Sequence, residues 1–236
     1  MIPKTIHYCW FGGNKKSRLI ERCINSWRET CPDYEIIEWN ENNFDIDVCP
    51  YVRGAYDAGK WAYVSDYARF YILEKHGGIY LDTDVELLKP LDELMEKGAF
   101  AGFASNRIVA TGLILACEKG SRFCREVLDS YEGQEFVDDA PDKILAIGRR
   151  VTAILQSHGL ELNGEEQTVD GITVYPKYYF NPTDGDMHAK VDERAYSVHH
   201  YAATWFPKKK RILNTLRRFI GSDIMEKYSK LKARIK

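Results

Sequence analysis

Residues 62–90, AYVSDYARFYILEKHGGIYLDTDVELLKP, contain a helix-like segment, a glycine pair and an apolar strand that ends in two aspartates. Apolar and aromatic residues cover most of positions 61–76. Gly77 and Gly78 close this segment, because glycine adopts the left-handed conformation that ends many helices. Residues 79–81 then predict a short buried strand. A helix followed directly by a buried strand is typical of an α/β domain.

The rest of the chain continues the alternation of strands and helices. Ile20, Cys23, Ile24 and Trp27 recur at helical spacing, and a polar, turn-rich loop is expected at 181–194. The pattern predicts a three-layer α/β domain with a mostly parallel central sheet, in which ligands gather at the carboxyl ends of the strands. The other predicted elements are strands at 5–11, 34–39, 99–103, 109–116, 172–175 and 195–199, and helices at 121–131 and 142–158.

The charges are distributed unevenly along the 236 residues. The chain has 35 acidic and 33 basic residues, so its net charge of −2 gives no reason to expect nucleic acid as a partner. Residues 208–236 hold eleven Lys or Arg and two acids, a net charge of +9, which leaves −11 on residues 1–207. We therefore predict a catalytic domain at 1–207 and a basic, amphipathic helical tail at 208–236.

Cysteine usage and hydropathy favour a cytoplasmic protein. The six cysteines form no Cys-x-x-Cys pair and fit no zinc-site spacing, so reduced thiols are expected. The first residues show neither a basic segment with a long apolar run nor a small-residue cleavage site. No stretch approaches the ~18–20 apolar residues that span a bilayer. The expected location is the cytoplasm, with peripheral binding to the inner face of the plasma membrane.

Asp82 and Asp84 are the most informative pair of polar residues. In an extended chain, residues i and i+2 face the same side, roughly 6.5–7 Å apart along the backbone. Two carboxylates that point together repel each other unless a cation or hydrogen-bond donors neutralise them, so a bound divalent metal is expected. The triplet alone is weak evidence, because chance and solvated turns also produce it.

The preceding helix adds a second pair of charges. Asp66 and Arg69 lie three residues apart on one helical face, beside Ser65. A solvated ion pair would explain this spacing, but the helix is so apolar that the two charges are expected to be partly buried. An acid beside a guanidinium suits sugar hydroxyls, which need both acceptors and forked donors.

Three segments together resemble glycosyltransferase family 32. Residues 62–90 are similar to the donor-site signature of that family, IHYCWFGG at 6–13 to its opening strand, and HHYAATW at 199–205 to its closing motif. The family comprises DXD-containing, GT-A-type sugar transferases, among them capsule-building enzymes and yeast-type mannosyltransferases, and is distantly similar to the glucosylating bacterial toxins. Two departures are Thr204, where the family usually has serine, and Tyr201, where tryptophan is common.

The resemblance implies a role for each matching residue. The implied donor-binding residues stack on the nucleotide base or hold the ribose, the diphosphate and the sugar: Trp10, Ser65, Asp66, Arg69, Asp82 and Trp205. The implied catalytic residues are Asp66, Arg69, Asp82 and Asp84, and the implied metal ligands are Asp84 and His200. The candidate residues of the acceptor pocket are Thr111, Gly112 and Tyr201.

Some of these residues have simpler interpretations. Without the resemblance, Trp10 would be interpreted as an ordinary core tryptophan. His199 and His200 point to opposite faces of a strand, so only one of them can face the metal, and we choose His200. His7 is expected to be structural.

The resemblance implies retaining transfer of a hexose from a nucleotide-sugar to a saccharide acceptor, such as a lipid-linked glycan in polysaccharide synthesis. UDP-sugars are favoured over GDP-mannose as donors. Mn²⁺ fits oxygen ligands plus one imidazole, with Mg²⁺ as the second choice. Front-face attack and a covalent route through a nearby carboxylate both agree with retention.

Two other function classes are alternatives. An aspartate-nucleophile phosphatase also has a strand followed by Asp-x-Asp, but it normally has Thr or Val where this chain has Glu86. A non-catalytic module that binds nucleotide-sugars would keep Trp10 and Asp66 without needing Asp84 or His200. Transfer of a sugar label distinguishes the enzyme from both.

The basic tail has one apolar face. Ile212, Leu216, Phe219 and Ile220 recur at helical spacing, and the opposite positions are basic. A solvated helix packed on the catalytic domain accounts for this pattern, and so does a helix that lies on an anionic membrane. We favour the membrane surface as its partner, because each basic residue near such a surface contributes on the order of 1 kcal/mol.

Overall fold

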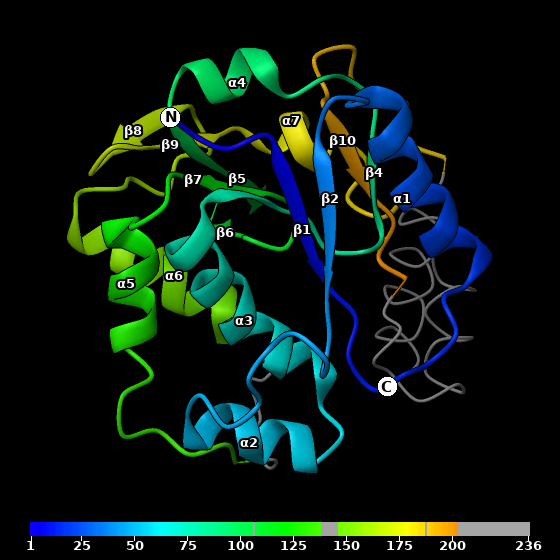
Figure 1. Ribbon diagram of the computed structural model, residues 1–236. Helices are drawn as coiled ribbons and strands as arrows, with labels where there is room; N and C mark the ends of the chain where they lie inside the picture. Colours follow the sequence, from blue (N-terminus) through cyan, green and yellow to red (C-terminus); the bar gives the residue numbers. More distant parts are fainter. Residues whose placement is uncertain (106, 138–145, 187, 203–236) are drawn as a thin grey trace, which may run out of the picture.

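The computed structural model describes residues 1–105, 107–137, 146–186 and 188–202. Its centre is an eight-stranded sheet in the order β2-β1-β3-β7-β5-β9-β8, with β6 paired to β5 (Figure 1). A separate two-stranded sheet joins β4 (Val85–Leu87) to β10 (Ser197–His199). The strands of the large sheet are β1 (Thr5–Cys9), β2 (Glu35–Trp39), β3 (Gly78–Tyr80), β5 (Ala99–Ser105), β6 (Ile108–Val109), β7 (Leu115–Cys117), β8 (Gln167–Val169) and β9 (Ile172–Tyr175).

Most strands of the large sheet run in one direction. β1 is parallel to β2 and β3, and β9 is parallel to β5. β7 lies antiparallel between β3 and β5, so β3 and β5 also run the same way. The expected α/β fold with a mostly parallel sheet is therefore confirmed, with β6, β7 and β8 as the reversed strands.

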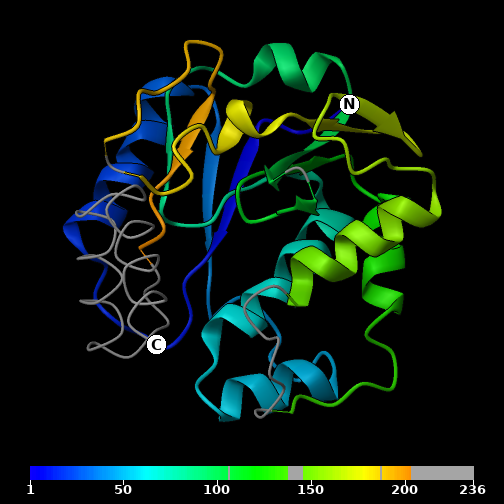
Figure 2. The same cartoon turned by 180° about the vertical axis from the view of Figure 1, so that it is seen from behind.

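Helices cover both faces of this sheet. Helix α1 lies on one side of β1 and β2, whereas α3, α5 and α6 lie on the other side in both views (Figures 1 and 2). Successive strand residues enter different cores: Ile79 packs in the core that contains the buried residues of α1, and Tyr80 packs in the core of α3. The helices are α1 (Arg18–Thr30), α2 (Pro50–Asp57), α3 (Trp61–His76), α4 (Asp92–Glu96), α5 (Arg122–Asp129), α6 (Ala146–Ser157) and α7 (Lys177–Phe180).

The segment that decides the fold adopts the expected helix and strand. Helix α3 ends at Gly77, whose φ of +68° lies in the left-handed region. Gly78 has a φ of +103°, and a Cβ at this position would lie 2.7 Å from the carbonyl oxygen of Thr5 in β1. Glycine at 78 therefore allows β3 to pair closely with β1, which places the aspartates at the carboxyl end of the sheet.

One predicted strand is wrong. Residues 109–116 do not form one strand: β6 ends at Val109, and β7 begins at Leu115. Between them the chain turns, with the N–H of Leu113 donating to the carbonyl of Ala110 (3.2 Å). In this turn the carbonyl of Gly112 accepts the N–H of Asp82 (2.9 Å). The break between β6 and β7 therefore helps to hold the chain that follows β3. Helix α2, α4 and α7 and strands β4 and β8 were not predicted.

Several sequence-based predictions lie outside the described residues. Thr204, Trp205 and the tail at 208–236 belong to this group, so the division at residue 207 stays a prediction. Among the helices that the structure describes, none combines the length and the apolar character needed to cross a bilayer. All six cysteines are free thiols.

Candidate active site

The two aspartates lie in a tight turn rather than in extended chain. The N–H of Val85 donates to the carbonyl of Asp82 (3.0 Å), which closes a turn over residues 82–85 directly after β3. The expected i, i+2 geometry of a strand therefore does not apply. The turn nevertheless brings both carboxylates together, because one ligand atom each of Asp82, Asp84 and His199 lie within 4.8 Å of one another.

His199 is the imidazole that faces the aspartates. It is the last residue of β10, and its Nε2 lies 3.2 Å from Oδ1 of Asp84. The other carboxylate oxygen of Asp84 accepts the N–H of Ala202 (2.7 Å). Burial raises the pKa of Asp84, but the charge and hydrogen bond of His199 and the N–H of Ala202 outweigh burial and lower this pKa to about 2. Asp84 is therefore an ionised carboxylate at neutral pH.

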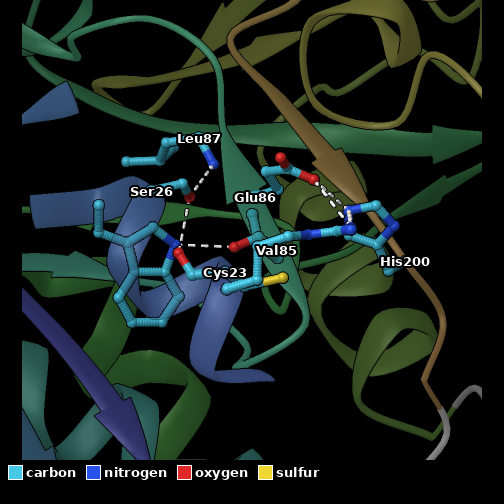
Figure 3. Close-up of polar contacts among 8 residues, drawn as sticks. Cys23, Ser26, Val85, Glu86, Leu87 and His200 are labelled. Carbon is cyan, nitrogen blue, oxygen red and sulfur yellow. Dashed lines mark hydrogen bonds and ion pairs between the residues drawn. The ribbon is translucent and has the colours of Figure 1, made fainter. Parts of the chain in front are cut away.

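His200 occupies a different place from the one predicted. Its Nε2 lies 2.6 Å from Oε2 of Glu86 (Figure 3). The expectation that only one of the two histidines faces the aspartates holds, because neighbouring strand residues point to opposite faces. The structure places His199, and not the predicted His200, beside the Asp84 carboxylate, because Asp84 lies in the turn over residues 82–85 and does not continue the alternation of strand β4. His199 therefore replaces His200 in the candidate ligand set.

Arg69 connects the helix to the first aspartate. One terminal nitrogen of its guanidinium lies 2.9 Å from Asp66 and 3.3 Å from Asp82. The guanidinium carbon also lies 4.8 Å from the ring centre of Tyr80. Burial lowers the pKa of Arg69, but Asp82, Tyr80 and Asp66 together raise it above its usual value, so the guanidinium stays charged. The expected partly buried ion pair is present, and it includes Asp82.

Asp66 has an unusual proton affinity. Burial raises the pKa of its carboxyl to about 6; the charge of Arg69 opposes this rise, and the charge of Asp82 adds to it. Two carboxylates and one guanidinium thus share a small region in which only part of the negative charge is compensated. Such a group can accept hydrogen bonds from hydroxyl groups and donate to them at the same point.

Ser65, Thr111 and Gly112 support these charges. The Ser65 hydroxyl donates to the carbonyl of Trp61 (3.0 Å), while the Ser65 carbonyl accepts from Nε of Arg69 (3.2 Å). Thr111 is 1% exposed, and its hydroxyl accepts from Arg69 (3.4 Å). A Cβ on Gly112 would lie 2.1 Å from Oδ2 of Asp82. The structure therefore places Thr111 and Gly112 against the donor-side charges, where the buried Thr111 side chain has little surface left for an acceptor.

Trp10 lines an open pocket beside the carboxyl ends of β1 and β2. The pocket measures about 420 Å³, and its lining includes Trp10, Lys16, Glu38 and Asn40. Trp10 is partly exposed, and its indole N–H donates to the carbonyl of Asn14 (2.6 Å). Trp10 is therefore not enclosed in the core, which disagrees with its interpretation as an ordinary core tryptophan.

Tyr201 lies against the candidate metal ligand. Its ring centre is 4.1 Å from that of His199, and its φ of +47° is unusual for a residue other than glycine. The Tyr201 hydroxyl accepts from the side-chain amide of Asn181 (2.8 Å), which comes from the loop after α7. The sequence analysis named Tyr201 as a site residue. It did not choose His199 as the candidate ligand and did not name Tyr80 or Asn181, because none of their contacts follows a sequence spacing.

Part of the chain matches a known family. Residues 17–101, which include Asp66, Arg69, Asp82 and Asp84, match the family described as "Glycosyltransferase sugar-binding region containing DXD motif". This segment is therefore similar to the sugar-binding region of DXD-containing glycosyltransferases. The match confirms the resemblance carried by residues 62–90, which lie inside the matched range. The two shorter similar segments, at 6–13 and 199–205, lie outside the matched range.

Curated relatives carry glycosyltransferase names. The chain is 30% identical over 135 residues to "Inositol phosphoceramide mannosyltransferase 3" of Schizosaccharomyces pombe, a match that covers 54% of this chain and 36% of the relative. It is 29% identical over 152 residues to "Lactosylceramide 4-alpha-galactosyltransferase" of Rattus norvegicus, which covers 58% of this chain and 39% of the relative. The chain thus spans well under half the length of these relatives.

A solved structure supports the fold. "PaToxG Glycosyltransferase" matches with a TM-score of 0.51 at 19% sequence identity, over 66% of this chain and 69% of that one. At this identity the similarity concerns the arrangement of helices and strands. It agrees with the α/β architecture built around the large sheet.

Proposed function

We propose that this chain is a retaining, metal-dependent glycosyltransferase that moves a hexose from a nucleotide-sugar, with UDP-sugars favoured, to a saccharide acceptor on a lipid. The observation that carries the proposal is the convergence of Asp82, Asp84 and His199 within 4.8 Å, beside the partly buried Asp66–Arg69 pair. The first group suits a cation with a diphosphate, and the second suits sugar hydroxyls.

The residues present fit a divalent cation. Asp82, Asp84 and His199 offer two carboxylates and one imidazole, a ligand set that suits Mn²⁺ and, as the second choice, Mg²⁺. A cation bound there would neutralise the diphosphate and make it a better leaving group. Because Asp84 has a pKa of about 2, its carboxylate is ready to bind a cation throughout the physiological pH range.

The protein's own side chains orient the donor. Trp10 would stack on the nucleotide base, whereas Asp66 and Arg69 would hold the hydroxyls of the sugar, since they provide acceptors and charged donors in one place. In the proposed transfer, the acceptor oxygen bonds to the anomeric carbon while the bond from that carbon to the diphosphate oxygen breaks. The electron pair stays on the diphosphate, which takes the acceptor proton. The sugar keeps its anomeric configuration when both events occur on one face.

The names of the relatives support a lipid-linked acceptor. Inositol phosphoceramide and lactosylceramide are both ceramide lipids, and the two relatives are named for transfer to them. We extend this chemistry to an acceptor that presents its saccharide at a membrane surface. The basic tail at 208–236 would keep the enzyme there: the full chain should co-sediment with anionic liposomes at low salt, and a chain ending at Pro207 should stay in solution. Equal sedimentation of both forms would contradict this role of the tail.

A panel of nucleotide-sugars tests the proposal directly. The protein should release sugar or transfer it to a glycolipid acceptor from one member of the panel when Mn²⁺ is present, and should stop when the metal is chelated. NMR of the product should show the anomeric configuration of the donor. An inverted product would reject the retaining mechanism. Release of phosphate from a simple monoester, without any sugar transfer, would support the phosphatase alternative instead.

A further inference from the structure

Among the strands that the structure describes, none neighbours β4 on the edge that faces α1. Its other edge pairs with β10: the carbonyl of Asp84 accepts the N–H of His200 (2.9 Å), and the N–H of Leu88 donates to Tyr196 (2.8 Å). Because hydrogen-bonding directions alternate along a strand, the backbone groups of Val85 and Leu87 point away from β10. They point toward α1.

Side chains of α1 take the place of the missing strand. The indole N–H of Trp27 donates to the carbonyl of Val85 (2.7 Å), and the Ser26 hydroxyl accepts the N–H of Leu87 (3.0 Å) (Figure 3). Trp27 is fully buried. The strand that begins directly after Asp84 is therefore fixed on both edges, by β10 and by one helix.

The end of β10 has a restraint of its own. β10 contains three residues, and two-stranded sheets of this size are marginally stable by themselves. Glu86 lies opposite Val198 in the register, yet its carboxylate reaches diagonally to His200 (2.6 Å), the residue that directly follows β10. Arg22 of α1 lies 3.4 Å from the same carboxylate oxygen. The ring of His200 is thus held on the face of β10 opposite to His199.

We propose that Glu86 and His200 are positioning residues for cation binding: their contact fixes the end of β10 so that His199 faces Asp84. The inference rests on the proposed cation site. If the ring of His200 turns away from Glu86, the chain after β10 keeps its backbone hydrogen bonds to Asp84, but the imidazole of His199 is less firmly oriented. Glu86 and His200 themselves would not touch the cation or the donor.

Mn²⁺ affinity, measured by isothermal titration calorimetry without donor, tests this role. Glu86→Ala should weaken Mn²⁺ binding by about 10- to 100-fold, the range observed when a residue that orients a metal ligand is removed. Glu86→Gln keeps an oxygen that accepts from His200 and should restore most of the affinity. The thermal midpoint of unfolding in a chelator should change little in either variant, since Glu86 is 28% exposed.

Glu93→Ala is the matched control. Glu93 accepts a hydrogen bond from the Tyr196 hydroxyl (3.0 Å) beside the opposite end of β10. This variant therefore also removes a carboxylate that holds the two-stranded sheet of β4 and β10. It should leave Mn²⁺ affinity unchanged. Unchanged affinity in Glu86→Ala, or an equal loss in Glu93→Ala, would overturn the positioning role while the cation site stands. If the unaltered protein does not bind Mn²⁺, or if Asp84→Asn binds it equally well, the proposed function fails and this inference fails with it.

Discussion

Two regions of the molecule bring one histidine and two carboxylates together. Among the described residues, Asp82, Asp84 and His199 form one such group at the carboxyl end of β3, and Glu126, His158 and Asp170 form the other between α5, α6 and the β8–β9 turn. In both groups the ligand atoms lie within 4.8 Å of one another. Residue composition and spacing alone would therefore not distinguish them.

The two groups differ in how the ring nitrogens are used. In the second group, Nε2 of His158 lies 2.8 Å from Glu126, while Nδ1 lies 4.0 Å from Asp170, so the two carboxylates face opposite edges of one ring. Asp170 also has Arg122 at 3.6 Å. A single cation can bind one edge of an imidazole, not both, and Arg122 already compensates part of the negative charge of this group. In the first group, both carboxylates come from one turn, and Nε2 of His199 lies 3.2 Å from Asp84.

Substitution of one residue in each group gives the largest expected difference between the two groups. Asp84→Asn removes a ligand charge, so Mn²⁺ affinity should fall by at least roughly 100-fold, and metal-dependent donor turnover should be lost. His158→Ala, the matched change in the second group, should alter neither quantity. Calorimetric titration with Mn²⁺ measures both variants. Metal binding that depends on His158 and not on Asp84 would reverse the comparison.

A third histidine sharpens the comparison, because both of its ring nitrogens meet neutral partners. His7 is 1% exposed; its Nε2 lies 2.9 Å from the carbonyl of Gly77, and its Nδ1 accepts the indole N–H of Trp39 (3.1 Å). Burial lowers the pKa of His7 from 6.5 to about 4, the Gly77 carbonyl opposes this, and the nearby His76 adds to it. His7 is thus a structural histidine that stays neutral, as expected from the sequence.

The pH dependence of stability follows from this pKa. Between pH 6.5 and pH 4, the unfolded chain binds a proton at His7 and the folded protein does not, so stability falls as the pH is lowered through this window. The loss amounts to about 3 kcal/mol in total. Urea unfolding of the unaltered protein and of His7→Gln should show a stability difference that shrinks toward pH 4. A difference that is constant across the window would show that His7 is not buried in its neutral form.

Long periodic segments made most of the fold predictable. Helices α1 and α3 have 13 and 16 residues, and their buried positions recur often enough to be recognised. Helices α4 and α7 have five and four residues, too few for a period to be visible. Strand β4 was missed because it pairs with β10, more than a hundred residues later in the sequence. Its formation depends on tertiary contacts.

The candidate site shows the same limit. Asp66 and Arg69 could be assigned because helical spacing determines which residues share a face. The choice between His199 and His200 depends on the strand register, and a shift of one residue exchanges the two faces. The sequence does not contain that register. Likewise, Asn181 meets Tyr201 only because two loops come together after the strands have paired.

Asp66→Asn tests whether the first region includes a sugar subsite. The variant keeps the shape of the side chain but removes the negative charge of Asp66, which pairs with Arg69. If Asp66 accepts hydrogen bonds from the sugar, kcat/KM for the donor should fall roughly 10- to 150-fold, since a hydrogen bond to a charged group contributes about 1.5–3 kcal/mol. The affinity for the nucleotide diphosphate alone should be preserved. An equal loss of kcat/KM for the donor and of affinity for the nucleotide diphosphate would assign Asp66 a structural role.

Trp10→Ala has the smallest expected effect and tests how far the first region extends. If the indole stacks on the nucleotide base, the affinity for the nucleotide diphosphate should fall by roughly 1–3 kcal/mol, which calorimetry would show as a rise in Kd. Trp10→Phe keeps an aromatic face and should lose less. The loop that carries the ring is held independently, since the N–H of Gly12 donates to Glu41 (2.6 Å), so the substitution should leave the loop in place. Unfolding of Trp10→Ala would instead show that the indole stabilises the core, and the pocket beside it would then no longer support a base-binding role.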